Sequence, residues 1–489
     1  MGFIAVDLGS TNIKVAVYNT KLECIARSSK PVVYDRTNGF VEFDACSYVD
    51  FLVDIVAGLE SKIEQAALTI RQIIFTGQAE SLVVLDEAGV PLMNAISWMD
   101  ERSAEECGLL EASFPGEEFE AVTGQLAVLP TWPATKILWL QRHKPEVFAR
   151  AAKFMLLKDY VVYCLTGKMF ADCSIATFSF CFDIYKKCYW TKMLDACGIT
   201  EDQLPPLIEP CSIAGPLRAC VADRLRLPKQ VKVNEGTLDH FAGMIGTGNV
   251  QEGSISLSTG TVMALATMAP SPVSAYQGIA MHYGFIPDTY VMLPVAESGG
   301  ACLEWFKSIC LNDVPYSEID MEIEKRRPPN DLVFLPYIVG TNAPEFDPNA
   351  SGVFYGLRTQ HDAYDMAYSV MEGVAFLLKK NCDDIKAKGT NISYIIATGG
   401  GARSALWCQI QADVTDLPVI IPREKEAACF GAAIIGAVSD GTFRDYDEAV
   451  KQTVKYDRMF KPRRSALLER KYRQFCKLYD MTLQIAQMH

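Results

Sequence analysis

The chain has 489 residues, 49% of them hydrophobic, and a formal net charge of −13. A chain of this length is too long to fold around one ordinary hydrophobic core, so we expect two domains or three. The acidic balance and the lack of a basic stripe argue against nucleic acid as a partner.

The sixteen cysteines include no Cys-x-x-Cys pair and are scattered through apolar and helical stretches. In a chain this long, such usage is typical of reduced thiols in a reducing compartment. The N-terminus reads as a strand and not as a basic segment followed by an apolar one, and no uncharged apolar run reaches about 18 residues. We therefore expect a cytoplasmic protein with no membrane partner.

Three short strands joined by tight turns are predicted at the start of the chain, over residues 3–7, 13–18 and 24–30. Apolar residues at helical spacing then predict a helix over 46–67. Residues 72–76 read as a short buried strand that ends at Gly77. A meander, a helix and a strand in this order indicate a mixed α/β fold.

The middle of the chain has helical patterns at 134–141 and 147–165, and then loops and short elements up to Pro228. The opening pattern returns over 253–268, where a small polar turn again joins two strands. Helix-like segments follow at 300–309 and 364–388. The repeated strand, turn and strand indicate an internally duplicated architecture, whose halves meet near residues 245–253.

The two small polar turns have residues suited to phosphate. They are Gly9, Ser10, Thr11 and Asn12 in the first turn, and Gly260 and Thr261 in the second. Glycine lets the backbone approach an anion closely, and hydroxyls add donors. Asp7 precedes the first turn, and Mg²⁺ prefers one or two carboxylates together with phosphate oxygens. Each turn taken alone is also typical of a plain hairpin.

A third glycine-rich loop, "TGGGARS" at 398–404, follows a predicted strand and precedes a predicted helix over 405–415. Such a loop leaves room for a flat adenine or a ribose, and the helix start offers free N–H groups. Flexible glycines at a helix start are the simpler alternative. The chain lacks the Walker A and Gly-x-Gly-x-x-Gly motifs, so a bound nucleotide would need another scaffold.

Six segments resemble the FGGY family of carbohydrate kinases, in the actin-like ATPase superfamily, and the resemblance extends over nearly the whole chain. Its two phosphate motifs are similar to "DLGSTNIKVAVYN" and "STGTVMALA". Its adenosine loop and the helix after it are similar to "ATGGGARSALWCQIQADV" and "AACFGAAIIGAV". Its two signature regions are similar to "PATKILWL" and "GVFYGLRTQHDAYDMAYSVMEG".

The resemblance implies an α/β chain of two ribonuclease H-like domains with a catalytic cleft between them. Residues 1–246 would carry the sugar site, the first phosphate motif and the catalytic aspartate, and residues 247–489 would bind the nucleotide. ATP is the implied phosphoryl donor, Mg²⁺ the implied metal, and a homodimer the implied assembly.

The resemblance also assigns the catalytic groups. Asp239 lies in "NEGTLDHFAGMIGTG", among small and apolar neighbours that would raise its affinity for a proton. The family pattern makes it the base that accepts the proton of the sugar hydroxyl, although an aspartate here also suits a helix N-cap. Asp7 matches the family's aspartate near the metal and the γ-phosphate. His240 lines the sugar pocket or is structural.

The resemblance places ATP-binding residues in both halves. They are Gly9, Ser10, Thr11, Asn12, Lys14, Gly260, Thr261, Gly300, Glu304, Gly400, Gly401 and Ser404. Lys14 reads equally well as a solvated strand residue, and Gly300 as a glycine required by close packing.

The predicted sugar loop reads Gly77-Gln78-Ala79-Glu80-Ser81 where xylulokinases tend to have Gly-Gln-Met-His-Gly and glycerol kinases Asn-Gln-Arg-Glu-Thr. The chain thus keeps the glutamate but lacks both the arginine and the histidine. Glu80 would accept two sugar hydroxyls, unless it is a surface charge. Trp98 and Asp100 would offer an indole face and a carboxylate to a polyol, with a plain core position as the alternative for Trp98.

These features predict a kinase that phosphorylates a small sugar, with a pentulose such as xylulose as the leading acceptor. Polyols such as erythritol or glycerol, and sugar acids such as gluconate, remain alternatives. Thr131 stands where glycerol kinases have a substrate tyrosine, which counts against glycerol itself. A non-catalytic, actin-like regulator that senses sugar is the alternative of another class.

Overall fold

The computed structural model describes residues 1–114, 118–269, 279–326, 330–345, 347 and 349–486. Their contacts divide the chain into two units. Unit 1 contains Met1–Val250, Ser271–Val291 and Glu426–Val454, and unit 2 contains Gln251–Pro270, Met292–Lys425 and Lys455–His489. Two later segments thus join unit 1, and the division between residues 246 and 247 stays a prediction.

Unit 1 is built on a six-stranded sheet with the order β13-β14-β5-β1-β2-β3. Its strands are β1(Gly2–Leu8), β2(Asn12–Asn19), β3(Cys24–Pro31), β5(Ile70–Gly77), β13(Ile213–Pro216) and β14(Lys232–Leu238). The predicted strands at the start of the chain and before Gly77 are confirmed. Strands β1 and β14 both pair in parallel with β5, so the carboxyl ends of all three strands lie at the same edge.

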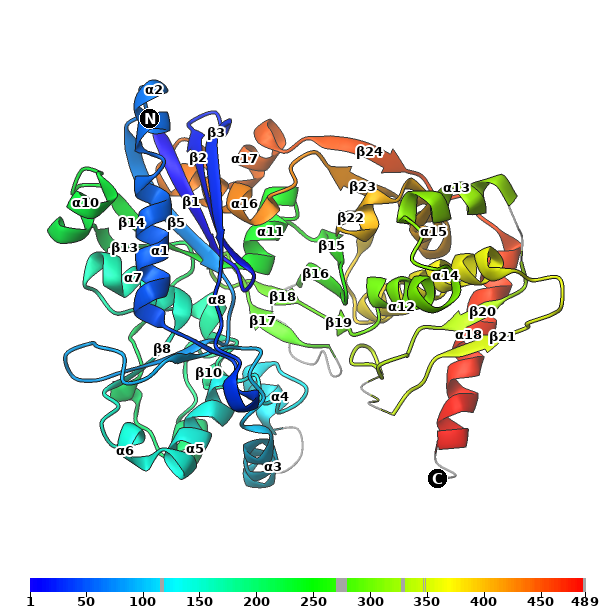
Figure 1. Cartoon of the computed structure of the whole chain (residues 1–489), viewed down its shortest axis with the longest axis horizontal. Coiled ribbons are helices and arrows are strands. Elements are labelled where there is room, and N and C mark those ends of the chain that lie inside the picture. Colours follow the sequence, from blue (N-terminus) through cyan, green and yellow to red (C-terminus); the bar gives the residue numbers. More distant parts are fainter. Residues whose placement is uncertain (115–117, 270–278, 327–329, 346, 348, 487–489) are drawn as a thin grey trace. The chain divides into compact units, whose positions relative to one another are not determined.

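Helices cover both faces of this sheet (Figure 1). Alternate β1 residues, beginning with Ile4, join a core with α1(Ala45–Ala57) and α7(Leu157–Thr166). The opposite face meets α16(Ala427–Ser439), whose Gly436 lies against Phe3 and Ile74.

Helix α16 also packs closely on α11(Asp239–Thr247). A Cβ on Gly246 would lie 2.0 Å from the carbonyl oxygen of Ala427, and one on Gly431 would lie 1.8 Å from that of Ala242. The small residues of "AACFGAAIIGAV" therefore let the backbones of α16 and α11 come into contact. Helix α11 begins at Asp239, directly after β14.

A second sheet of unit 1 has the order β4-β7-β6-β8. Its strands are β4(Glu42–Phe43), β6(Leu82–Leu85), β7(Ala95–Ile96) and β8(Lys153–Leu156). The helical pattern predicted over 147–165 is wrong in its first half, because β8 pairs there with β6 and α7 begins only after it. A short buried apolar run satisfies a helical and a strand pattern equally, and here pairing with β6 decides.

The remaining elements of unit 1 are mostly short. They are η1(Thr37–Gly39), α2(Glu60–Gln65), α3(Ala104–Ser113), α4(Glu118–Thr123), α5(Pro133–His143), α6(Pro145–Phe148), β9(Ala171–Asp172), α8(Cys173–Ala176), β10(Phe182–Asp183), β11(Cys188–Tyr189), α9(Thr191–Cys197), η2(Glu201–Gln203), β12(Leu207–Ile208), α10(Ala219–Leu225), β17(Met281–Tyr283) and α17(Tyr446–Thr453). The helix predicted over 46–67 is divided, because α1 ends before Gly58 and α2 starts at Glu60. Strand β18(Tyr290–Met292) spans the last two residues of this unit's middle segment and the first residue of the second segment of unit 2.

Unit 2 repeats the strand plan of unit 1. Its strands are β15(Gly253–Thr259), β16(Met263–Ala269), β19(Val295–Ala296), β22(Ile392–Gly399), β23(Val419–Pro422) and β24(Tyr456–Phe460), with β20(Val333–Leu335) and β21(Val353–Tyr355) paired separately. Strand β15 pairs antiparallel with β16 and parallel with β22, as β1 does with β2 and β5. The predicted internal duplication is therefore confirmed at the level of strand pairing.

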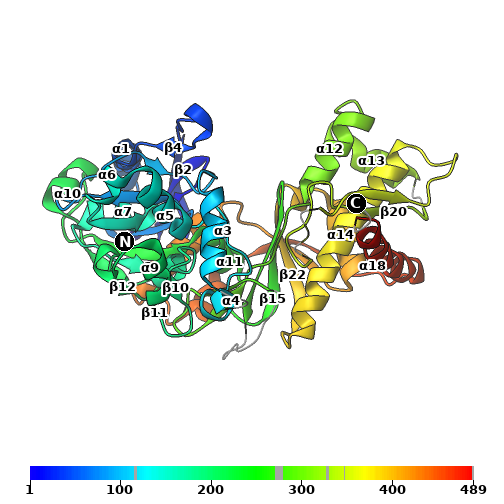
Figure 2. The same cartoon turned by 90° about the horizontal axis from the view of Figure 1, so that it is seen from below.

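The long helix α14(Ala363–Ala387), yellow in Figure 2, organises the helices of unit 2. It contacts α12(Gly300–Cys310), α13(Tyr316–Arg326), α15(Ala405–Thr415) and α18(Ala466–Ala486), and η3(Gly401–Arg403) precedes α15. The predicted helices at 300–309, 364–388 and 405–415 are confirmed.

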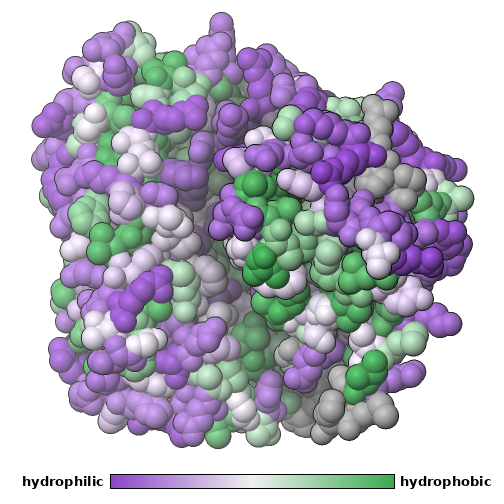
Figure 3. All heavy atoms as spheres, turned by 45° about the vertical axis from the view of Figure 1, so that its right-hand side comes forward, coloured by the Kyte–Doolittle hydropathy of each residue, from purple (hydrophilic) through white to green (hydrophobic). Residues whose placement is uncertain are grey.

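The surface shown in Figure 3 is largely hydrophilic, with hydrophobic residues in patches between the polar ones. None of the described helices combines the length and the apolarity that a membrane span requires.

Candidate active site

Three acidic residues come together where the central strands of unit 1 end. Asp7 of β1 lies opposite Thr76 of β5, which in turn lies opposite Thr237 of β14. Asp239 follows β14, and Glu80 lies in the loop after β5. Because parallel strands end at a common edge, the pairing brings the predicted base, metal ligand and sugar ligand into one neighbourhood.

The Asp7 carboxylate has an unusual environment. Burial, with the charge of Asp239 adding to it and that of Lys14 opposing it, raises the pKa of Asp7 to about 7. Its Oδ1 is buried and has no hydrogen-bond partner among the described residues. A hard divalent cation would satisfy this oxygen and would favour the ionised form, so the donor set fits Mg²⁺.

Asp239 is the first residue of α11, and the N-cap position belongs to Leu238. Its carboxylate accepts a hydrogen bond from the backbone N–H of His240, at 2.6 Å. Burial raises the pKa of Asp239, while the hydrogen bond and charge of His240 oppose the shift. A carboxylate with raised proton affinity and little hydrogen bonding is suited to accept a proton. The His240 side chain itself is exposed.

The predicted sugar loop after β5 is held in a specific conformation. Glu80 is partly buried and has a φ of 67°, in the left-handed region that residues with a Cβ seldom adopt. Burial raises the pKa of Glu80 to about 7, while the charge of Lys136 and a hydrogen bond from Thr131 lower it and Asp239 raises it further. Gln78 accepts a hydrogen bond from Ser81 at 3.0 Å, and the methyl group of Ala79 is buried.

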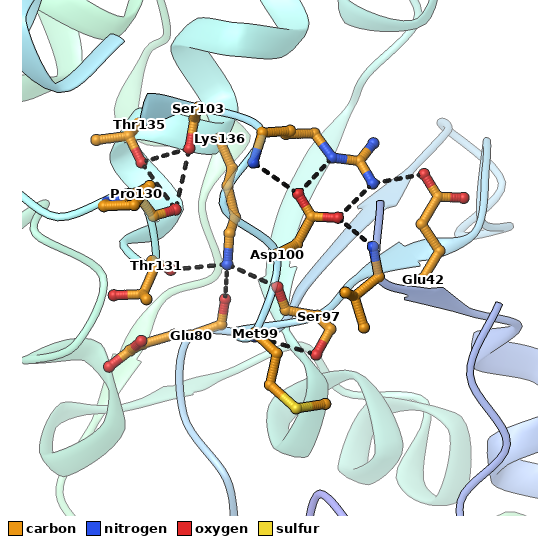
Figure 4. A network of polar contacts seen from close by, with 12 residues as sticks. Glu42, Glu80, Ser97, Met99, Asp100, Ser103, Pro130, Thr131, Thr135 and Lys136 are labelled. Atoms are coloured by element: carbon orange, nitrogen blue, oxygen red, sulfur yellow. Dashed lines mark hydrogen bonds and ion pairs between the residues drawn. The ribbon is translucent and has the colours of Figure 1, made fainter. Parts of the chain in front are cut away.

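Trp98 and Asp100 have different surroundings. The Trp98 side chain is 36% exposed, so the core alternative for it is wrong. Asp100 is fully buried, and its two oxygens accept hydrogen bonds from Arg102, at 2.7 Å each, and from the backbone N–H of Val41. Figure 4 shows this network. The carboxylate is already committed within the protein, which argues against the predicted contact of Asp100 with sugar hydroxyls.

Sequence reasoning missed two cations beside this loop. Arg102 pairs with Asp100 and with Glu42, at 2.8 Å, and lies 3.9 Å over the ring of Phe40. Lys136 of α5 is fully buried and donates to backbone carbonyls near Glu80. The signal for Lys136 was a lysine within the otherwise apolar stretch "PATKILWL".

Unit 2 contains a cavity of about 680 Å³ at the end of β15. Seven predicted ATP-binding residues line it: Gly260, Thr261, Gly300, Glu304, Gly400, Gly401 and Ser404. Its size lies in the range of small-molecule sites. The aromatic residues Trp305, Tyr316 and Trp407 also line it, and no sequence pattern predicted them as part of the site.

The other five predicted ATP-binding residues lie in unit 1, at the turn between β1 and β2 and just beyond it. They are Gly9, Ser10, Thr11, Asn12 and Lys14. The turn is tight, since a Cβ on Gly9 would lie 2.8 Å from the carbonyl oxygen of Asn12. Lys14 forms an ion pair with Glu426 at 2.7 Å, so it is not simply a solvated strand residue.

A further acidic group lies between α3 and α5, where ligand atoms of Glu105, Glu106 and His143 come within 4.8 Å of one another. Arg142 pairs with both glutamates. Its positive charge at the same oxygens opposes a metal cation, so Asp7 is the better candidate metal ligand.

Comparisons with known proteins match the whole length of the chain. The model described as the FGGY family of carbohydrate kinases, N-terminal domain, matches residues 3–246, and that for the C-terminal domain matches residues 253–439. A xylulose kinase from Staphylococcus epidermidis is 29% identical over 99% of this chain and 97% of its own. One from Escherichia coli is 31% identical over 84% of each chain. The crystal structure of xylulose kinase from Rhodospirillum rubrum has a TM-score of 0.93, with 24% identity and 100% of both chains covered, and shows the same two-domain fold.

Proposed function

Since the chain belongs to the FGGY family of carbohydrate kinases, we propose that it transfers the γ-phosphate of ATP to a hydroxyl of a pentulose such as xylulose. The observation that carries the proposal is the convergence of Asp7, Glu80 and Asp239 at the ends of parallel strands. A kinase for an alcohol needs a base, a metal ligand and a group that orients the acceptor. Each carboxylate is suited to one of these roles.

In the proposed reaction Asp239 accepts the proton of the attacking hydroxyl. Its raised pKa suits this task, because a carboxylate with a higher pKa is a stronger base. Glu80 accepts hydrogen bonds from other hydroxyls of the acceptor and fixes its orientation. The indole of Trp98 offers a face for the C–H side of the sugar.

Asp7 would hold Mg²⁺ through its otherwise unpartnered Oδ1, an assignment that the described residues favour. Mg²⁺ neutralises charge on the phosphate groups when it is bound. The cavity beside Gly260, Gly300 and Gly400 would hold the nucleotide, because glycines let a ligand approach the backbone closely and the volume suits a small molecule. Lys14 would contact phosphate from its position beside Glu426.

The site's charges favour an uncharged acceptor. A sugar acid would bring a fourth carboxylate close to Asp7, Glu80 and Asp239, whereas a pentulose brings only hydroxyl and carbonyl groups. The names of the relatives from Staphylococcus epidermidis and Escherichia coli support xylulose in particular. The proposal also includes a homodimer, which light scattering can test.

A coupled assay of ADP release across pentuloses, polyols and gluconate tests the function. We expect turnover that depends on sugar, with a pentulose giving the highest kcat/KM. Nucleotide binding without turnover on any member of the panel would contradict the proposal and would favour a non-catalytic regulator.

A further inference from the structure

Lys136 donates hydrogen bonds to three backbone carbonyls from separate loops of unit 1. Its ammonium lies 3.3 Å from the oxygen of Glu80, 2.9 Å from that of Ser97 and 2.7 Å from that of Thr131 (Figure 4). An ammonium has three N–H donors, so these bonds use all of them. The side chain is fully buried. Because bulk solvent does not reach the ammonium, each bond ties its loop directly to α5.

Two of the three loops carry predicted sugar ligands, and the third supplies a partner of Glu80. Glu80 is itself such a ligand, Ser97 directly precedes Trp98, and the side chain of Thr131 bonds the Glu80 carboxylate. Ser81 adds a second connection, because its hydroxyl accepts a bond from the backbone N–H of Trp98 at 3.1 Å.

The conformation of Glu80 explains why such an anchor is needed. Its left-handed backbone is unfavourable for a residue with a Cβ and persists only where the surroundings enforce it. Lys136 holds the carbonyl of this same residue. Burial lowers the pKa of Lys136 to about 8, and the charges of Glu80 and Asp100 oppose that shift, so the ammonium persists at neutral pH.

We infer that Lys136 is a positioning residue that holds the two loops of the predicted sugar ligands against the Thr131 loop and thereby sets the affinity for sugar without touching it. The inference rests on the proposed function. It predicts an effect that grows as hydrogen-bond donors are removed, because each lost donor frees one loop.

Two substitutions test this inference. Lys136→Met removes all three donors, and Lys136→Gln keeps two. We expect Lys136→Met to raise the sugar KM about tenfold to a hundredfold, because small misplacements of binding groups have effects of this size. Lys136→Gln should give a smaller rise. The KM for ATP and the slow hydrolysis of ATP without sugar should stay near the wild-type values.

Lys471→Met is the matched control, because Lys471 is a buried lysine of unit 2 that bonds Glu372 and the carbonyl of Asn330. It should lower the melting temperature without raising the sugar KM. An unchanged sugar KM in Lys136→Met, or an equal rise in the control, would overturn the inference. If Lys136→Met does not fold, the same criteria apply to Lys136→Gln.

Hydrogen–deuterium exchange separates this inference from the proposed function. Lys136→Gln should speed exchange in the segments around Glu80, Ser97 and Thr131 compared with the wild type. Equal exchange there would refute the positioning role, whatever the substrate. A wild-type protein that turns over no sugar would refute the proposed function alone, and exchange would still decide the role of Lys136.

Discussion

Replacement of Gly300 by alanine should weaken nucleotide binding through a single methyl group. Gly300 is the first residue of α12 and lines the cavity of unit 2. Its N–H donates to the carbonyl of Gly260 at 2.7 Å, which joins the helix start to the predicted phosphate turn. An added Cβ would lie 2.5 Å from that same carbonyl oxygen.

The size of the effect follows from this clash. Both partners are backbone, so neither can move aside as a flexible side chain would, and the turn must shift away from the helix. Overpacking of this kind costs about 1–3 kcal/mol. If the nucleotide site bears that cost, the KM for ATP rises about 5-fold to 150-fold, since about 1.4 kcal/mol corresponds to a factor of ten.

Steady-state kinetics with ATP and sugar varied in turn will measure this effect. The KM for ATP should rise while the sugar KM stays nearly constant. Gly108→Ala is the matched control, because a Cβ at that exposed position in α3 would meet nothing within 4 Å. It should stabilise the protein by up to about 1 kcal/mol and leave both constants unchanged. A wild-type KM for ATP in Gly300→Ala would refute the reasoning.

Two other changes have outcomes that the described contacts determine. The folded state raises the pKa of Asp7 from 3.8 to about 7. At a pH between these two values, Asp7 is protonated in the folded protein and ionised in the unfolded chain. The free energy of unfolding therefore falls as the pH rises through this range. Asp7→Asn should therefore have a higher melting temperature than the wild type near pH 8 and a similar one near pH 4, and it should lose activity. A melting temperature equal to or below that of the wild type near pH 8 would contradict this. Arg102→Met leaves the buried Asp100 carboxylate without its cation and should cost about 3–5 kcal/mol in chemical denaturation, whereas an unchanged free energy of unfolding would show that the pair is dispensable.

Local sequence pattern was enough to predict the two hairpins and their polar turns. Alternation and turn residues identify a strand pair such as β1 and β2 without tertiary information. The helical pattern over 147–165 predicted the wrong structure at β8, where a few buried apolar residues follow a short helix. Only the pairing with β6 distinguishes a strand from a helix there. The predicted 46–67 helix is divided for a local reason, because Gly58 caps the end of α1.

The candidate site was predictable in its residue types and not in its connections. A carboxylate near the end of a strand marks Asp7, and one directly after a strand marks Asp239, but the proximity of the two depends on the strand order, which no local pattern encodes. The pairing of Asp100 with Arg102 through both carboxylate oxygens was not predictable, because two opposite charges two positions apart do not by themselves indicate a buried ion pair. Lys136 was overlooked because its acceptors are backbone carbonyls, which leave no trace in the sequence.

Turnover of the Asp239→Asn variant tests the central claim most directly. The carboxylate's hydrogen bond to His240 can be kept by the amide oxygen, so the variant should fold and should bind nucleotide and sugar as before. Loss of the base should lower kcat about 10²-fold to 10⁴-fold on the preferred pentulose. Wild-type kcat in a folded variant would contradict the account.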